Sequence, residues 1–379
     1  MEKQSISIKK VTILAGAFCA YMIGSGFSTG QEVLQFFSVY GVAKGIISTL
    51  VYAAITIWLI YTLYGTGQKM QFSNPYDVFE YYCGKYIGKF YTWYSVVLLY
   101  GIYVVMLAGA GATINQYFGI PAYIGGYGVA ILALLTALLG VEKLINIIGV
   151  IGPIKIVFMI VVGVSAFITM ASQPNLLSEN SALIQTVGFQ QASGNWLWSG
   201  ILYAFLGLVF GNAFFVMNGQ TAKNLREARL GGVIGAIALA GAVILLIIAE
   251  NVYLDVIEGQ QVPTLAIANH ISPALGLIFA LIIVLCIYSA VSSILQVVTR
   301  NFAVDKTKKF NILATVLTVV GMFGGMVLPF DKMVNLLYVI AAYSGIVLTG
   351  FMIYKEFINK NAFPFRKSND ENKDVDVAV

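Results

Sequence analysis

Apolar stretches of about 20 residues or more recur along nearly the whole chain and are separated by short polar segments. Such a run predicts a membrane-spanning helix, because about 20 residues at ~1.5 Å rise each cross the hydrocarbon core of a bilayer. The runs are too long for the alternating strands of a membrane barrel. The pattern predicts ten spans, at residues 11–39, 42–66, 90–117, 121–140, 144–171, 196–218, 229–252, 274–298, 310–328 and 333–355.

Composition places the chain in the same class. Of its 379 residues, 59% are hydrophobic and 10% are charged, whereas a soluble domain carries roughly 25% charged residues. We therefore predict an all-α integral membrane protein with a single ten-helix domain over residues 1–355. A charged, disordered cytoplasmic tail is expected over residues 356–379. The three cysteines have no metal or disulfide spacing, which indicates packing residues.

The basic residues indicate the orientation. If the N-terminus lies inside, 19 of the 22 Lys and Arg residues fall in inner segments, Lys44 and Lys332 fall outside, and Lys155 lies within the fifth span. Cytoplasmic segments of membrane proteins carry this excess of positive charge. The net charge of +5 thus reflects topology and does not indicate nucleic-acid binding. The expected surroundings are a lipid bilayer, with both termini in the cytoplasm.

Two spans contain residues that interrupt a helix. Span 1 reads Gly24-Ser25-Gly26 and then Gly30-Gln31-Glu32, and span 6 has glycines at the corresponding place, within Tyr203–Asn212. Backbone that such a break frees cannot face hydrocarbon, so it must face protein or a cavity. Ten spans divide into inverted halves, about 11–171 and 196–355. Broken helices at matching positions of such halves mark the substrate site of a transporter.

Several motifs resemble one family. Ile23-Gly24-Ser25-Gly26-Phe27 is similar to the first-span glycine motif of the amino acid–polyamine–organocation (APC) superfamily. Phe205-Leu206-Gly207 followed by Lys223-Asn224-Leu225-Arg226 is similar to its sixth span and the basic loop after it, and Gly140-Val141-Glu142-Lys143 leading to Lys155 is similar to its fifth span. As a whole, the chain resembles the YkvI-type bacterial membrane proteins of that superfamily. The resemblance implies the LeuT fold in a bacterial cytoplasmic membrane, with spans 1, 2, 6 and 7 rocking against spans 3, 4, 5 and 8. In one departure, Val209 stands where the permeases often carry an acidic residue.

The two breaks supply the candidate substrate site. The helix that restarts after Gly24–Gly26 presents backbone N–H groups and the positive end of its dipole, which favour a carboxylate. Carbonyl groups at the end of the opposing half-helix suit an ammonium group, so a zwitterion such as an amino acid fits both. The alternative is that the glycines only allow close helix packing. The candidate substrate-binding residues are Ile23, Gly24, Ser25, Gly26, Tyr103, Tyr203, Ala204, Phe205, Leu206 and Gly207.

A lysine of span 5 and three serines of span 8 are the candidate ion-site residues. Lys155 is expected near mid-bilayer, where a lysine costs at least ~2.5–3.5 kcal/mol and needs a partner. In related permeases a lysine here takes the place that sodium has in sodium-coupled relatives, and Ser289, Ser292 and Ser293 resemble the sodium-ligand pattern. Three interpretations stay open. Lys155 replaces Na⁺ and carries protons, the serines bind Na⁺, or Ser292 and Ser293 only bond back to their own helix.

Side chains near the outer ends of the spans suggest a gate. Glu32, six residues beyond Gly26, and Tyr203 are the candidate gating residues. For Glu32 the alternatives are a proton carrier and a plain interfacial carboxylate. Glu250, near the outer end of span 7, is expected to be interfacial. His270 lies in an outer loop and is expected at the surface.

These features predict a secondary active transporter, a symporter or exchanger that works by alternating access. Its expected substrate is a small polar or zwitterionic solute, such as an amino acid or a related compound. The alternative is a membrane receptor or sensor that binds small ligands on the same fold without transport. No cofactor is expected, and Na⁺ or H⁺ is the expected coupling ion. The sequence has no nucleotide-binding loop, hydrolytic motif or metal-ligand spacing, so we expect neither an enzyme nor a metal site.

Overall fold

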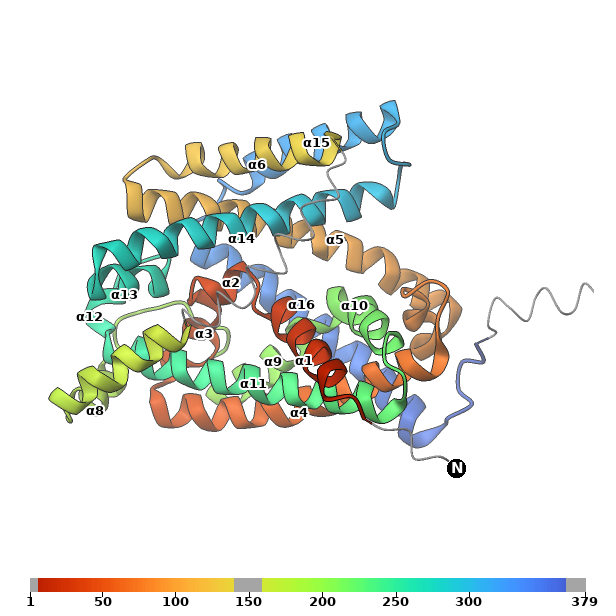
Figure 1. Ribbon diagram of the computed structural model, residues 1–379, viewed down its shortest axis with the longest axis horizontal. Coiled ribbons are helices and arrows are strands. Elements are labelled where there is room, and N and C mark those ends of the chain that lie inside the picture. The colour runs from red at the N-terminus through yellow and green to blue at the C-terminus, as the bar shows by residue number, and fades with distance from the viewer. Residues whose placement is uncertain (1–5, 140–158, 366–379) are drawn as a thin grey trace, which may run out of the picture.

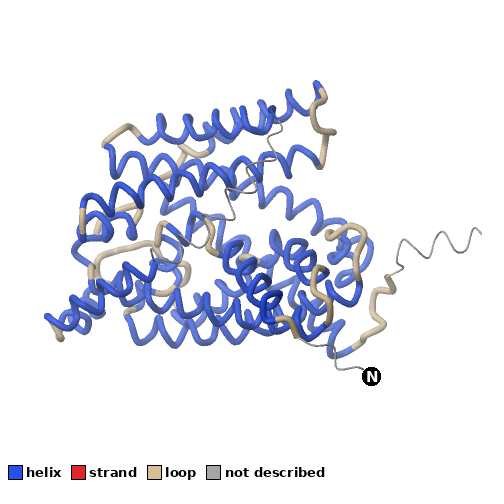
Figure 2. The backbone as a smooth tube through the Cα atoms, in the orientation of Figure 1, coloured by secondary structure: helices blue, strands red, loops and turns tan. Residues whose placement is uncertain are grey.

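The computed structural model describes residues 6–139 and 159–365, and within these ranges it is built of helices without a strand (Figure 2). The first range contains α1 (Ile8–Met22), α2 (Ser25–Ser28), α3 (Gln31–Phe36), the 3-10 helix η1 (Ser38–Tyr40), α4 (Val42–Met70), α5 (Asp77–Phe118) and α6 (Ala122–Leu139). The second contains the helix Met159–Ser172, α8 (Leu176–Leu183), α9 (Trp196–Leu206), α10 (Leu208–Gln220), α11 (Leu225–Val252), α12 (Leu254–Ile257), α13 (Pro263–Ile271), α14 (Pro273–Arg300), α15 (Lys308–Gly324), α16 (Phe330–Ile353) and the π-helix η2 (Tyr354–Ile358).

The helices follow the predicted spans. Within the described ranges, six helices are long and apolar enough to cross a membrane, and two helix pairs bent at short breaks raise the number to eight. Span 1 is divided among α1, α2 and α3, and α15 has only 17 residues, so neither is among the eight. Of span 5, only the part from Met159 is described. The all-α membrane fold is confirmed, and a total of ten spans is compatible with it.

Local sequence sets where the helices begin. Ser7, Asn195, Asn224 and Thr307 precede α1, α9, α11 and α15, and the side-chain oxygen of each accepts a hydrogen bond from a backbone N–H of the first turn. These residue types are favoured at that position because they satisfy N–H groups that the helix leaves free. Proline, which lacks an N–H group, stands in the first turn of α13 and α14.

The helices pack in two groups, and the pieces of the broken spans 1 and 6 lie between them together with α16 (Figure 1). In the first group α4 lies along α11, and both contact the broken spans: α11 packs on α1, and α4 on α9 and α10. In the second group α5, α6 and α14 pack on one another, and α15 packs on α6. α16 joins the groups, because it contacts both α9 and α5. The broken spans 1 and 6 thus pack mainly on spans 2 and 7, and less on spans 3, 4 and 8.

The two ends of the helix array differ in their loops. α8, α12 and α13 lie at one end, and α1 begins near the other (Figure 1). Following the charge distribution, we call the first the outer end and the second the inner end.

Part of the predicted tail is ordered. Residues 356–365 pack against the inner end, where Lys355 Nζ donates to the carbonyl oxygens of Tyr81 at 2.5 Å and Phe363 at 3.1 Å. The Phe363 ring lies against Gly84, whose positive φ of 74° interrupts α5. The packed domain therefore extends past residue 355, because aromatic residues beyond it find apolar partners.

Glycines let α4 and α10 approach closely, which gives a test of the packing. A Cβ atom at Gly219 of α10 would overlap the Tyr64 backbone of α4, whereas a Cβ at Gly241 of α11 would meet no described atom within 4 Å. We expect Gly219→Ala to destabilise the protein by about 1–3 kcal/mol. Gly241→Ala should be neutral or slightly stabilising, because alanine favours a helix over glycine. Unfolding by SDS in mixed micelles measures both. Equal stability of the two variants would contradict this packing.

Candidate functional site

Span 1 is interrupted twice around Gly26. α1 ends at Met22, the chain passes through Ile23 and Gly24, and α2 contributes a single turn before a second break at Gly30, where φ is 82°. The sequence placed the break at Gly24–Gly26, but Ser25 and Gly26 lie in the helical turn that follows it. The Ser28 N–H donates to the Gly24 carbonyl oxygen at 3.1 Å, which uses backbone groups that a longer break would leave free.

The carboxylate of Glu32 folds back over this turn. A Cβ atom at Gly26 would overlap Glu32 Oε1 and would lie 2.9 Å from the Tyr338 hydroxyl oxygen. The Tyr203 hydroxyl donates to Glu32 Oε2 at 3.0 Å. Glu32 is 6% exposed, and both tyrosines are buried. Glu32 of α3, Tyr203 of α9 and Tyr338 of α16 therefore meet at Gly26, so glycine is the residue that leaves room for the carboxylate.

Aromatic rings enclose Tyr203 on its other sides. The rings of Phe36, Phe37 and Tyr52 have their centroids 5.0 to 5.1 Å from that of Tyr203, and all four residues are fully buried. Rings at this separation attract one another beyond the effect of burial alone. The aromatic cluster holds Tyr203 in position and excludes water from its hydrogen bond to Glu32.

The second break is centred on Gly207. α9 and α10 meet there at an angle of 49°. A Cβ at Gly207 would lie 3.0 Å from Met22 Sδ, so the break in span 6 touches the end of α1. Ala204, Gly207 and Met22 line a cavity of ≈ 20 Å³, which is about the size of one water molecule. The two interrupted helices therefore lie against each other with little space between them.

Two predicted binding residues point elsewhere. A Cβ at Gly321 of α15 would lie 2.5 Å from Tyr103 Cε1, and the Tyr103 ring stacks on that of Tyr100. Tyr103 thus faces α15 and not the breaks. The Phe205 carbonyl oxygen lies against Gly345 of α16, so it is not available to an ammonium group beside span 1. Leu206 ends α9, and both it and Ile23 are buried.

The predicted ion-site residues are only partly described. Lys155 lies outside the described residues. Ser292 Oγ donates to the Tyr288 carbonyl oxygen at 2.7 Å, and Ser293 Oγ donates to that of Ser289 at 2.9 Å. Both hydroxyls bond back to their own helix, as the plainest of the three interpretations predicts. The Ser289 hydroxyl has no hydrogen-bond partner among the described residues. α14 does contact α2, as a site between spans 1 and 8 would require.

Hydrogen bonds close the outer end over the breaks. Gln35 Nε2 of α3 donates to the Asp331 carbonyl oxygen of α16 at 2.8 Å. Thr264 of α13 donates through its hydroxyl to the Ser28 carbonyl at 2.7 Å and through its N–H to the Thr29 carbonyl at 3.1 Å. These bonds join the outer part of span 1 to both α16 and the loop helix α13. The structure is therefore closed on this side.

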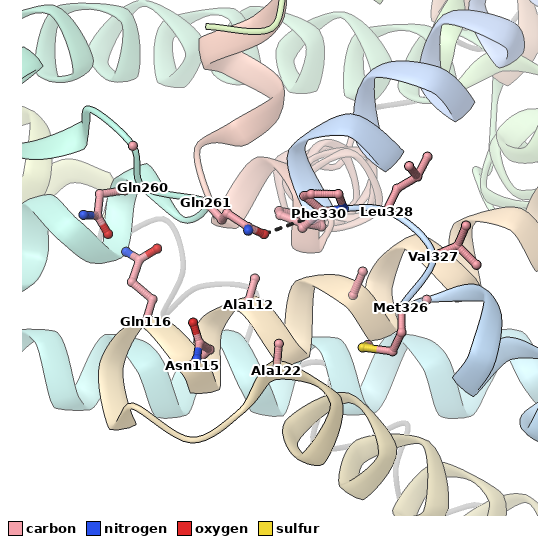
Figure 3. A pocket seen from close by; sticks show the side chains of 14 residues that line it. Ala112, Asn115, Gln116, Ala122, Gln260, Gln261, Met326, Val327, Leu328 and Phe330 are labelled. Atoms are coloured by element: carbon pink, nitrogen blue, oxygen red, sulfur yellow. Dashed lines mark hydrogen bonds between the residues drawn. The ribbon is translucent and has the colours of Figure 1, made fainter.

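An open hollow lies above this closure. It has a volume of ≈ 440 Å³ and is lined by the outer end of α5, the loop before α13 and the loop before α16 (Figure 3). The Gln116 side chain exchanges two hydrogen bonds of 2.9 Å with the Val262 backbone. Gln261 Oε1 accepts from the Phe330 N–H at 3.1 Å (Figure 3). These two amides are therefore occupied in holding the loops and are not free to bind a solute.

Glu250 is not the interfacial residue that the sequence predicts. The expected interfacial residue is fully buried, and Ser38 Oγ donates to its Oε2 at 2.5 Å. No local signal indicates this, because Ser38 is 212 positions away in the sequence. His270 is exposed, as predicted.

The arrangement defines the class of fold, and two solved structures share it. The crystal structure of MhsT in complex with L-phenylalanine matches 94% of this chain and 90% of its own length, with 16% identity and a TM-score of 0.63. A Na⁺-coupled sialic acid symporter, in a substrate-bound outward-open state, matches 94% of this chain and 82% of its own, with 12% identity and a TM-score of 0.56. The chain has the LeuT fold.

Sequence comparison adds a relative. The membrane protein YkvI of Bacillus subtilis (strain 168) is 26% identical over 263 residues, which cover 68% of this chain and 73% of YkvI. No protein-family model matches the chain. The chain is thus similar to the membrane protein YkvI and has the LeuT fold, in agreement with the resemblance of its motifs.

The bond between Glu32 and Tyr203 can be measured by a double-mutant cycle. We expect Glu32→Gln and Tyr203→Phe each to destabilise the protein, and the double variant to lose less than their sum, with a coupling of about 1–3 kcal/mol. Tyr52→Phe is the matched control, because its hydroxyl has no hydrogen-bond partner among the described residues. Unfolding by SDS in mixed micelles provides the free energies. Strict additivity would show that the two side chains do not interact.

Proposed function

We propose that the protein is a secondary active transporter that moves a small polar or zwitterionic solute by alternating access. The observation that carries this proposal is the meeting of two interrupted helices, at which Glu32 of the first accepts a hydrogen bond from Tyr203 of the second. Interrupted helices at the membrane midplane are costly unless their freed polar groups are used. The LeuT fold shared with MhsT and the sialic acid symporter supports the same assignment.

The packing suggests how access alternates. Spans 1, 2, 6 and 7 form one packed group, and spans 3, 4 and 8 form another. In the proposed cycle the first group rocks against the second, while α3, the outer part of span 1, turns at Gly30 relative to the rest of its group. Opening the outer end requires α3 to leave α16 and α13, which breaks the bonds of Gln35 and Thr264 and releases Tyr203 from Glu32. Glu32 and Tyr203 are thus proposed as gate residues.

The charge at the breaks bears on the substrate. The carboxylate of Glu32 already lies beside Gly26, where a substrate carboxylate was expected. We propose that the ammonium group of an amino acid or a related amine is drawn to Glu32, while backbone around Ile23, Gly24, Ser25 and Gly26 and the surface of Ala204, Leu206 and Gly207 hold the rest of the solute. The structure of MhsT contains L-phenylalanine, which makes amino acids the first compounds to test.

Counterflow tests transport directly. The purified protein in liposomes loaded with unlabelled amino acids or their decarboxylated amines should accumulate the matching labelled compound. Gly207→Leu should abolish this exchange, because the larger side chain would fill the ≈ 20 Å³ cavity beside Met22. A Cβ at Gly241 would meet no described atom within 4 Å, so Gly241→Leu is the control that should exchange normally. Compounds that raise the denaturation temperature without any exchange would instead identify a receptor.

The coupling ion is proposed to depend on Lys155 or on the serines of α14. If Lys155 replaces Na⁺, then Lys155→Ala should abolish uptake driven by a proton gradient, because no other basic group lies near the middle of a predicted span. If the serines bind Na⁺, the variant should keep its response to a sodium gradient, and Ser289→Ala should lose it. Lys332→Ala, at an exposed position, is the matched control. Unchanged proton-driven uptake by Lys155→Ala would exclude the lysine.

A further inference from the structure

A second buried carboxylate lies close to the outer break of span 1. Glu250, near the outer end of α11, has no exposed surface. Its Oε2 accepts a hydrogen bond of 2.5 Å from Ser38 Oγ, directly after α3. The neighbouring Asn251 donates through Nδ2 to the Ser38 carbonyl oxygen at 3.3 Å. Two consecutive residues of α11 thus hold the segment that follows α3.

The other oxygen of Glu250 points at the break itself. A Cβ atom at Gly30 would lie 2.7 Å from Glu250 Oε1 and 2.9 Å from Thr264 Cγ2. Gly30 has a φ of 82°, a backbone conformation that disfavours any residue other than glycine at this position. Oε1 has no hydrogen-bond partner among the described residues. One half of the carboxylate is therefore buried against the turn between α2 and α3 without a donor.

Two further acceptor oxygens lie on the adjoining residues. Gln31 Oε1, one position after Gly30, and Asn251 Oδ1, one position after Glu250, also have no partner in the described part of the chain. Both residues are buried. Unpaired acceptors without a matching donor indicate a missing positive charge or a missing proton, because a buried acceptor left alone costs about 1–3 kcal/mol.

Neighbouring side chains do not supply that charge. The described elements around this end of α11 carry seven charged or titratable groups. They are Glu32 of α3, Tyr40 of η1, Lys44 of α4, Glu179 of α8, Tyr253 just before α12, Asp255 of α12 and His270 of α13. Lys44, Glu179, Asp255 and His270 are exposed. Tyr40 bonds Ser193, and Glu32 bonds Tyr203. Within the described ranges no ion pair includes Glu250.

We propose that Glu250, with the oxygens of Gln31 and Asn251, binds a single monovalent cation, a proton or an alkali metal ion. Carboxylate and amide oxygens are hard ligands suited to such a cation, and a carboxylate taken out of water is stable only when it is neutralised or paired. None of these three residues is among the ion-site residues that the sequence predicts.

The position of the site links it to the outer gate. Gly30 lies in the turn that joins α2 to α3, and Thr264 bonds the backbone just before that turn. Loss of the cation would leave Glu250 charged against this turn and favour its movement away from α11. The role in transport rests on the proposed function, but binding of the cation does not and is tested without a substrate.

Thermal denaturation of the full chain in detergent tests the binding. The probes are pH, and NaCl or KCl against choline chloride at constant ionic strength. If a proton occupies the site, the wild-type denaturation temperature should fall as pH rises, because the neutral acid is the form that the buried site holds. If an alkali ion occupies it, the temperature should rise with Na⁺ or K⁺ at fixed pH. Glu250→Gln should lose the dependence, since a neutral amide needs no counter-charge.

Two further variants keep the test decisive. Glu258→Gln changes an exposed carboxylate in the following loop and should respond like the wild type. Ser38→Ala removes the donor to the ionised carboxylate, so it should move the midpoint of the pH response upward or weaken the response to Na⁺, even if Glu250→Gln does not fold. The proposal is overturned if the denaturation temperature of Glu250→Gln depends on pH or on Na⁺ as that of the wild type does. It is also overturned if the wild-type temperature depends on neither pH nor alkali ions, or if Ser38→Ala leaves the response unchanged. Failure of counterflow with a positive result here would reject transport and keep the site.

Discussion

The hydrogen bond between Glu32 and Tyr203 joins the two helices that the chain interrupts. An ionised side chain buried in protein is costly unless donors lie close to it. Tyr203 provides one from span 6, and the missing side chain at Gly26 provides the space. Two segments 171 positions apart in sequence are thereby held together where each has a break. The positions of α3, α9 and α16 relative to one another follow from this contact.

Glycine has a different role at each of four positions in and around the breaks. At Gly26 the absence of a side chain admits the Glu32 carboxylate, whereas at Gly30 it permits a positive φ. At Gly207 it lets span 6 approach Met22, and at Gly345 it lets α16 approach the Phe205 carbonyl. All four positions also lie against distant segments: Tyr338 at Gly26, Glu250 at Gly30, Met22 at Gly207 and Phe205 at Gly345. A substitution there would act on the meeting of the spans more than on the helix that carries it.

Features set by neighbouring residues could be predicted from the sequence, whereas contacts between distant residues could not. Helices such as α4 and α11 were predictable because apolar length and charge placement act locally, and the breaks were predictable because glycine weakens a helix wherever it stands. The partner of a side chain depends on packing. Tyr103 faces Gly321, and Glu250 faces Ser38, and nothing within a few residues of either indicates it. The motifs indicated where the site lies, while the directions of its side chains came from the fold.

The two buried carboxylates act on opposite sides of one short segment. Glu32 lies after Gly30 and holds α3 to α9, and Glu250 approaches Gly30 from α11. Because α3 cannot leave α9 without turning at Gly30, a charge that appears on Glu250 and the release of Glu32 from Tyr203 would both displace the same backbone. A cation at one carboxylate and a solute ammonium at the other would therefore influence each other through this turn, without direct contact. A secondary transporter needs such coupling between its two ligands, because uncoupled crossing of either one would dissipate the gradient.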